Sequence, residues 1–213
     1  MSDYRLVVLG PELRDAAAVC ILAHGRGGAP EDMARLAAAL DVADVRYLLP
    51  AAPGNSWYPQ SFMAPFAANE PFLGRSLANH AALIEGVVAA GYPAARVVLG
   101  GFSQGACLTA ETLVRVPQRY GAALILTGGL IGPPGSVWPP APALAGTPVY
   151  LTGSEVDPHV PPGRSRESGR VLGGNGAAVE LRLFADRPHM ITPEEIARAR
   201  AYLSDVAAGG VIA

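Results

Sequence analysis

A serine flanked by glycines constrains this chain more than any other feature of its sequence. Residues 101–105 read Gly-Phe-Ser-Gln-Gly, directly after the apolar run 96–100 and directly before 106–116, which has helical periodicity. A serine on a sharp turn between a buried strand and a helix has the geometry of a nucleophile elbow, and the glycines let the backbone turn tightly around the hydroxyl. The pattern predicts an enzyme with Ser103 as its nucleophile.

Apolar runs alternate with helical patterns along the whole chain. Strands are predicted at 4–10, 18–23, 45–49, 96–100, 122–127, 148–152 and 179–184, and helices at 29–40, 75–90, 106–116, 162–172 and from 193 onward. Continuously apolar strands such as 18–23 are typical of a parallel sheet that is covered on both faces. We expect an α/β fold: a compact single domain over residues 1–213, with a doubly wound, mostly parallel sheet and helices on both faces.

The alternation is interrupted at about residues 54–74. Aromatic residues are interleaved there with prolines, without a clean period. Because function in such folds collects on the loops after the carboxyl ends of strands, we interpret this segment as a lid or the wall of a substrate pocket. A packed surface insertion is the alternative. The candidate substrate-binding residues are Trp57, Tyr58, Phe62 and Phe66.

Composition argues against several classes of function. The net charge of −2, with scattered arginines, favours neither a nucleic acid nor a membrane as partner. All 16 basic residues are arginine, and the absence of lysine excludes Ser-Lys dyads, Schiff-base chemistry and the Walker A phosphate loop. No apolar run is long enough for a transmembrane helix and the N-terminus lacks a signal-peptide pattern, so a cytoplasmic location is expected.

A nucleophilic serine needs a base, and the base needs an acid that fixes its tautomer. Among the four histidines, His189 follows the last predicted strand, where a serine-acid-histidine chain order places the base. His159 is the alternative. His24 is expected to brace a loop by hydrogen bonding, and His80 to have a structural or exposed role in a helix.

Asp157 is the candidate acid. It lies on the loop after the strand that follows the elbow and its helix, with Pro158 stiffening the turn behind it. Glu155 could reach the same place, and Asp186 lies close to His189 in sequence.

Two backbone N–H groups are expected to form an oxyanion hole. One belongs to Gln104, the residue after the nucleophile, and the other to Arg26, in the glycine-rich segment that follows strand 18–23. Their role would be to hold the negative charge that develops on a carbonyl oxygen.

Four motifs together resemble the phospholipase/carboxylesterase family of α/β-hydrolases, which includes acyl-protein thioesterases and bacterial carboxylesterases. They are His-Gly-Arg-Gly-Gly at 24–28, Gly-Phe-Ser-Gln-Gly at 101–105, the Asp-Pro-x-Val-Pro segment within 153–161, and Pro-His at 188–189. The resemblance covers most of the chain in order. It implies a compact α/β-hydrolase that cleaves carboxylic esters or thioesters without a cofactor or metal, with Ser103, Asp157 and His189 as the triad.

The chain departs from the family pattern in two places. Arg26 stands where relatives often have an uncharged apolar residue, which would place a guanidinium beside the site. The aromatic stretch 57–72 differs from the lid of acyl-protein thioesterases. We therefore expect a carboxylesterase for small-molecule esters with small or aromatic groups, acting as a monomer or homodimer. A thioesterase or a lactone/dienelactone-type hydrolase is the alternative, and a non-catalytic ligand-binding protein on the same fold is a distant one.

Overall fold

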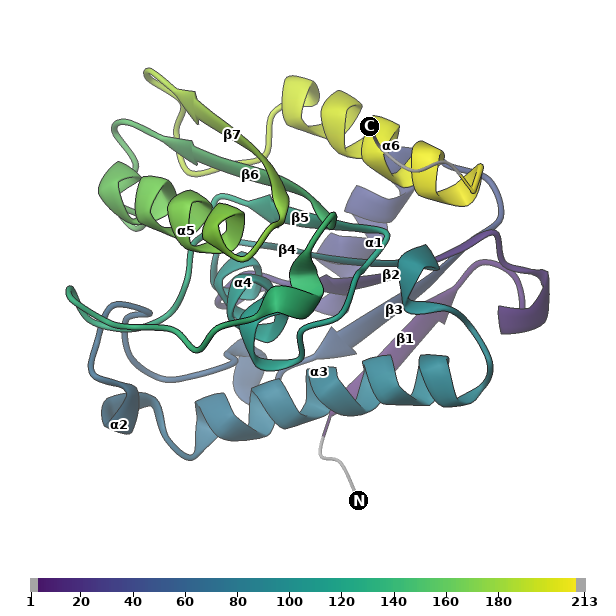
Figure 1. Ribbon diagram of the computed structural model, residues 1–213, viewed down its shortest axis with the longest axis horizontal. Helices are drawn as coiled ribbons and strands as arrows, with labels where there is room; N and C mark the ends of the chain where they lie inside the picture. The colour runs from purple at the N-terminus through teal and green to yellow at the C-terminus, as the bar shows by residue number, and fades with distance from the viewer. Residues whose placement is uncertain (1–3, 210–213) are drawn as a thin grey trace.

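The computed structural model describes residues 4–209; residues 1–3 and 210–213, the two ends of the expected domain, lie outside the described residues. Seven strands form one sheet in this part of the chain (Figure 1). They are β1 (Arg5–Leu9), β2 (Ala18–Ala23), β3 (Val45–Ala51), β4 (Val97–Phe102), β5 (Ala122–Leu126), β6 (Pro148–Ser154) and β7 (Ala178–Phe184). Their spatial order is β1-β3-β2-β4-β5-β6-β7, with β1 antiparallel to β3 and all other neighbouring pairs parallel. The expected mostly parallel sheet is confirmed.

Helices cover both faces of the sheet (Figure 1). They are α1 (Pro30–Leu40), the short α2 (Phe66–Asn69), α3 (Phe72–Ala89), α4 (Gln104–Arg115), α5 (Pro162–Gly174) and α6 (Pro193–Ala207). On one face α1 and α6 bury residues such as Met33 and Leu203. On the other, α3, α4 and α5 bury residues such as Ile84, Leu113 and Leu172. This is the doubly wound α/β architecture that the sequence predicts.

The parallel register brings the ends of the central strands to one edge of the sheet. Every residue of β2 and β5 is buried, which explains their continuous apolar sequences. Near the carboxyl ends, Ala23 pairs with Gly101 and Ser154 with Phe184. The segments that carry the candidate site residues therefore leave the sheet at the same edge, as is usual for ligand sites in such folds.

The last helix begins at a well-defined cap. Thr192 Oγ1 accepts a hydrogen bond from the N–H of Glu195 at 3.2 Å, and Glu195 Oε2 accepts one from the N–H of Thr192 at 2.8 Å. With Pro193 in the first turn, this reciprocal capping box fixes where α6 starts. It also fixes where the loop after β7, which contains His189, must end.

The aromatic segment 54–74 contains little regular structure apart from α2, and its last residues belong to α3. The helix predicted from residue 75 starts earlier, at Phe72, because Leu73 and Ser76 already lie on its buried face, one turn before His80. A proline at residue 71 is compatible with a helix that starts directly after it.

Candidate active site

Ser103 lies on the turn between β4 and α4, in a backbone conformation that non-glycine residues rarely adopt, with φ 54° and ψ −116°. Its N–H donates to the carbonyl of Leu126, at the end of β5, at 3.1 Å. A side chain on Gly105 would come within 2.1 Å of the Ala23 carbonyl oxygen, and one on Gly101 within 2.5 Å of the backbone of Gly105. The flanking glycines thus allow β2, β4 and α4 to approach closely, and this packing holds the serine on the turn.

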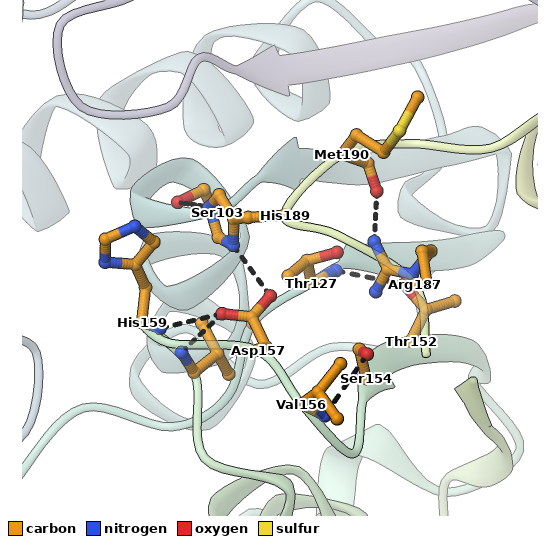
Figure 2. Close-up of polar contacts among 12 residues, drawn as sticks. Ser103, Thr127, Thr152, Ser154, Val156, Asp157, His159, Arg187, His189 and Met190 are labelled. Carbon is orange, nitrogen blue, oxygen red and sulfur yellow. Dashed lines mark hydrogen bonds and ion pairs between the residues drawn. The ribbon is translucent and has the colours of Figure 1, made fainter. Parts of the chain in front are cut away.

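A continuous hydrogen-bond chain connects the three residues that the sequence singles out (Figure 2). His189 Nε2 lies 2.8 Å from Ser103 Oγ, and His189 Nδ1 lies 2.7 Å from Asp157 Oδ2. Because a carboxylate only accepts, Nδ1 must carry the ring proton, which leaves Nε2 free to accept from the serine hydroxyl. The tautomer needed in a general base follows from this geometry.

Asp157 is held as a carboxylate. Its side chain is fully buried, which alone would raise its pKa, but hydrogen bonds from His189 and from the N–H groups of Val160 and His159 outweigh burial and lower the pKa. Those two amides lie 2.9 Å and 2.8 Å from Asp157 Oδ1. A carboxylate that stays ionised can stabilise an imidazolium at His189.

The alternative carboxylates lie elsewhere. Glu155 forms an ion pair with Arg166 on the surface, and Asp186 is exposed. Neither is placed against the imidazole of His189, whose Nδ1 contacts Asp157.

The other histidines have the surroundings of structural or lining residues. His159 stacks edge-on against His189, with 4.8 Å between ring centroids, and contacts Asp157 through its backbone. His24 is buried and braces its loop as expected: Nε2 accepts from the N–H of Ala52 at 3.1 Å, and Nδ1 lies 2.7 Å from the Gly25 carbonyl. His80 is buried in α3.

The two expected oxyanion donors lie on elements that leave such groups available. Gln104 is the first residue of α4, where backbone N–H groups have no partner within the helix. The turn around Arg26 is fixed on its far side, since Gly27 N–H donates to Asn55 O at 2.7 Å and Gly28 N–H to Gly25 O at 3.0 Å.

A cavity of about 560 Å³ opens over Ser103. Its lining includes Tyr58 and Phe62 of the expected substrate-binding residues, and Arg26, whose guanidinium borders the site as the sequence predicts. It also includes His159, which the sequence offers as the alternative base, and five residues that the sequence did not single out: Pro59, Gln60, Ser61, Cys107 and Val160.

Two of the expected substrate-binding residues do not line this cavity, so that part of the prediction is wrong. Trp57 is 1% exposed, and its indole N–H donates to the His24 carbonyl at 2.7 Å. Phe66 lies in α2, with the guanidinium of Arg115 5.7 Å from its ring centroid. Both rings pack in one apolar cluster, which includes Leu73 and Leu108.

Residues 6–207 match the sequence model of the Phospholipase/Carboxylesterase family. The chain belongs to the phospholipase/carboxylesterase family. A crystal structure of a phospholipase/carboxylesterase from Dyadobacter fermentans is 35% identical, with a TM-score of 0.89 over 95% of this chain and 97% of that one. The Bacillus cereus carboxylesterase, 21% identical, shares the fold with a TM-score of 0.77 over 96% of this chain and 95% of that one. The resemblance and the α/β-hydrolase fold that it implied are confirmed.

Among curated relatives, two fungal proteins named acyl-protein thioesterase 1 are similar to this phospholipase/carboxylesterase family member. The Gibberella zeae protein is 31% identical over 123 residues, and the Eremothecium gossypii protein 28% over 158 residues. The matched stretches cover 57% and 71% of this chain, and 52% and 66% of the length of the two relatives.

Two side chains of this family member brace the aromatic loop in a way that the sequence analysis missed. Gln104 Oε1 accepts from the N–H of Trp57 at 3.0 Å, while its Nε2 donates to the Tyr58 carbonyl at 2.7 Å. The guanidinium of Arg26 donates to the carbonyls of Pro59 at 2.9 Å and Gln60 at 2.6 Å. Gln104 was selected for its backbone N–H alone, and Arg26 for its backbone N–H and for a guanidinium beside the site; both side chains also fix one wall of the cavity.

Arg187 is a further residue with an unpredicted role, because nothing in the sequence distinguishes it from a surface arginine. Its side chain is only 3% exposed and donates to the Met190 carbonyl (Figure 2). Its guanidinium also lies 3.7 Å from Glu195 Oε2. It therefore connects the two sides of the loop that carries His189 to the cap of α6. Its position suits a residue that orients the imidazole.

Two negative findings concern residues 4–209. No helix in this range is long and apolar enough to cross a membrane, and no three His, Cys, Asp or Glu side chains are grouped so that they could hold a metal ion.

Proposed function

We propose that this protein is a serine carboxylesterase that hydrolyses small-molecule esters with small or aromatic groups. The observation that carries the proposal is the continuous hydrogen-bond chain from Ser103 through His189 to Asp157 at one edge of the sheet. Membership of a hydrolase family supports the same reaction class.

In this mechanism Ser103 Oγ attacks the ester carbonyl carbon while His189 Nε2 takes the hydroxyl proton. The N–H groups of Arg26 and Gln104 hold the oxyanion, and Asp157 stabilises the imidazolium. Collapse of the tetrahedral intermediate breaks the bond to the alcohol oxygen, which receives the proton from His189. A water activated by His189 then hydrolyses the acyl-enzyme and frees Ser103.

Thioester hydrolysis is the second candidate, because two curated relatives are named acyl-protein thioesterase 1. The same nucleophile, base and oxyanion donors serve both reactions, which differ in the leaving atom. We favour compact substrates over long acyl chains because Arg26 and the carbonyls of Pro59 and Gln60 make one wall of the cavity polar. The monomeric or homodimeric state and the cytoplasmic location stay predictions.

The test is intact-mass labelling with a fluorophosphonate, followed by a substrate panel on the same preparation. We expect one label per wild-type chain, none in Ser103→Ala, and preference for short or aromatic p-nitrophenyl esters over long esters, thioesters and lactones. A folded wild-type protein that is neither labelled nor active would overturn the esterase proposal. Preferred cleavage of thioesters would replace it by the second candidate.

A further inference from the structure

A second cavity, of about 490 Å³, lies beside the first. The two share Arg26 and His189 in their linings, but only the first is lined by Ser103. In Figure 2, His159 of the first cavity and Met190 of the second lie on opposite sides of His189. The second cavity thus opens next to the proposed base, on the side of Met190.

The walls of this second cavity are mostly apolar. Met33 and Leu36 come from α1 and are buried in the core, while Ile191 follows from the loop after β7. Phe102 directly precedes the nucleophile, and its ring centroid lies 5.2 Å from that of His189. Met190, 48% exposed, forms the more open wall.

Gly25 has no side chain, and this leaves room for the ring of Phe102 in the wall of the second cavity. A Cβ atom on Gly25 would lie 3.3 Å from Phe102 Cδ1, tighter than ordinary contact. The glycine-rich segment therefore lets an aromatic ring stand next to the proposed base as well as freeing backbone N–H groups.

The charged side chains around this cavity already have hydrogen-bond partners. Arg35 forms an ion pair with Asp32, whose other carboxylate oxygen accepts from the N–H of Ala29 at 2.8 Å. The guanidinium of Arg26 is bound to the carbonyls of Pro59 and Gln60 on the side of the first cavity. A ligand here meets mostly apolar side chains, one ion pair and a guanidinium that is hydrogen-bonded towards the first cavity, which favours a neutral, apolar group.

The chemistry of ester cleavage distinguishes the two cavities. The acyl group stays bonded to Ser103 after the alcohol has left, so it belongs in the cavity that Ser103 lines. The leaving alcohol oxygen must receive its proton from His189 Nε2 and then depart. Resting on the esterase function proposed above, we propose that the second cavity binds the alcohol portion of the substrate and accepts a neutral alkyl chain or an unsubstituted ring.

The substitution Met190→Ala tests this assignment with two ester series. In the first, acetates of straight-chain alcohols from ethyl to hexyl vary only the alcohol, and leaving-group reactivity is nearly constant. In the second, p-nitrophenyl esters vary only the acyl group. We expect kcat/KM of the wild type to rise with alcohol length, and Met190→Ala to lower the hexyl-to-ethyl ratio about tenfold, the scale of lost apolar contacts. The acyl-series ratios should not change.

A second variant and a control support the comparison. Leu36→Phe narrows the same cavity from the helix side and should also lower the hexyl-to-ethyl ratio. Val137→Ala shortens a 91% exposed aliphatic side chain outside both linings and should leave both series as in the wild type. The rate of hydrolysis of a preformed acetyl-enzyme should be equal in all four proteins, because the alcohol has already left.

The outcomes separate this proposal from the esterase function. A wild type that labels with fluorophosphonate and cleaves esters, but shows no dependence on alcohol length, overturns the second subsite alone. A Met190→Ala variant that changes the acyl series and leaves the alcohol series intact reverses the assignment and also overturns it. A wild type without labelling or hydrolysis overturns the esterase function itself.

Discussion

Ser103 adopts a positive φ that costs a non-glycine residue on the order of 1–3 kcal/mol. The surroundings maintain it, since Gly101 and Gly105 allow the backbone of β2, β4 and α4 to pack closely around the turn. At this residue, stability is sacrificed to present a hydroxyl to His189.

Glycine and alanine substitutions at Ser103 should therefore differ in stability although both remove the hydroxyl. We expect turnover to fall about a millionfold in both, as for a protease nucleophile. Ser103→Gly should nevertheless be more stable than Ser103→Ala by about 1 kcal/mol, because glycine relieves the strain. Urea unfolding of the two inactive variants measures this difference. An alanine variant as stable as the glycine variant would show that the turn is not strained.

Arg187 should matter for catalysis although it does not reach the reacting atoms. We expect Arg187→Met to lower kcat by about 100-fold, the scale for a displacement of about 1 Å in a catalytic group, because its contacts to Met190 and Glu195 fix the loop around His189. Fluorophosphonate labelling should slow in parallel, measured well below the melting temperature.

The matched control is Arg182→Met. That guanidinium lies on β7, is half-exposed and pairs with Glu194 at 3.2 Å. Arg182→Met should leave kcat within about twofold of the wild-type value, since exposed ion pairs contribute little to stability. Equal losses in the two variants would remove Arg187 from the role of a positioning residue.

At the scale of elements, α4 connects the nucleophile to the wall of the first cavity. Its first residue, Gln104, supplies a backbone N–H to the proposed oxyanion hole and a side-chain amide to the loop at Trp57 and Tyr58. The two functions can be separated, because a side-chain substitution leaves the backbone N–H in place.

Gln104→Ala should weaken substrate binding more than the chemical step. We expect KM to rise about tenfold, the scale of one or two lost buried hydrogen bonds, while kcat changes less than threefold. Gln104→Glu keeps the acceptor for Trp57 N–H but loses the donor to Tyr58 O. Its KM should therefore lie between those of the wild type and Gln104→Ala. Steady-state kinetics with a short ester tests this, and a loss confined to kcat would contradict it.

The sequence predicted the strands and the positions of Ser103, Asp157 and His189 because these depend on local apolar runs and on chain order. The sequence did not predict features that depend on contacts between distant segments, such as which side chains are buried and which line the cavity. The segment 54–74 has no period, so nothing local indicates that Trp57 turns inward to His24 while Tyr58 and Phe62 line the cavity. The burial of Arg187 likewise depends on its ion pair with Glu195, which no local sequence pattern indicates.

At the scale of the whole molecule, buried histidines link stability to pH. Burial lowers the pKa of His80 to about 4 and also lowers that of His24. In the unfolded chain a histidine titrates near 6.5. Below that pH the unfolded state binds protons that the folded state excludes, so stability falls as the pH decreases from about 6.5 towards 4.

His80→Phe should weaken this dependence on pH. Between pH 7 and pH 5 the wild type should lose about 2 kcal/mol of unfolding free energy through His80, and the variant should not show this part of the loss. Urea unfolding at the two pH values measures it. His159→Phe, which replaces an exposed histidine, is the matched control and should keep the wild-type loss. If the wild type and His80→Phe lost the same unfolding free energy between pH 7 and pH 5, His80 would not be the source of the pH dependence.

The proposed base is carried by an edge of the sheet. Within residues 4–209, β7 pairs only with β6 and is half-exposed, whereas β4, which leads directly into Ser103, lies in the middle of the sheet. Edge elements open locally more easily than central ones. Such partial opening would withdraw His189 and leave the rest of the fold intact, so catalysis should cease at denaturant concentrations where spectroscopy still reports a native protein. By the same reasoning, the melting temperature would overstate the temperature range in which this molecule is catalytically active.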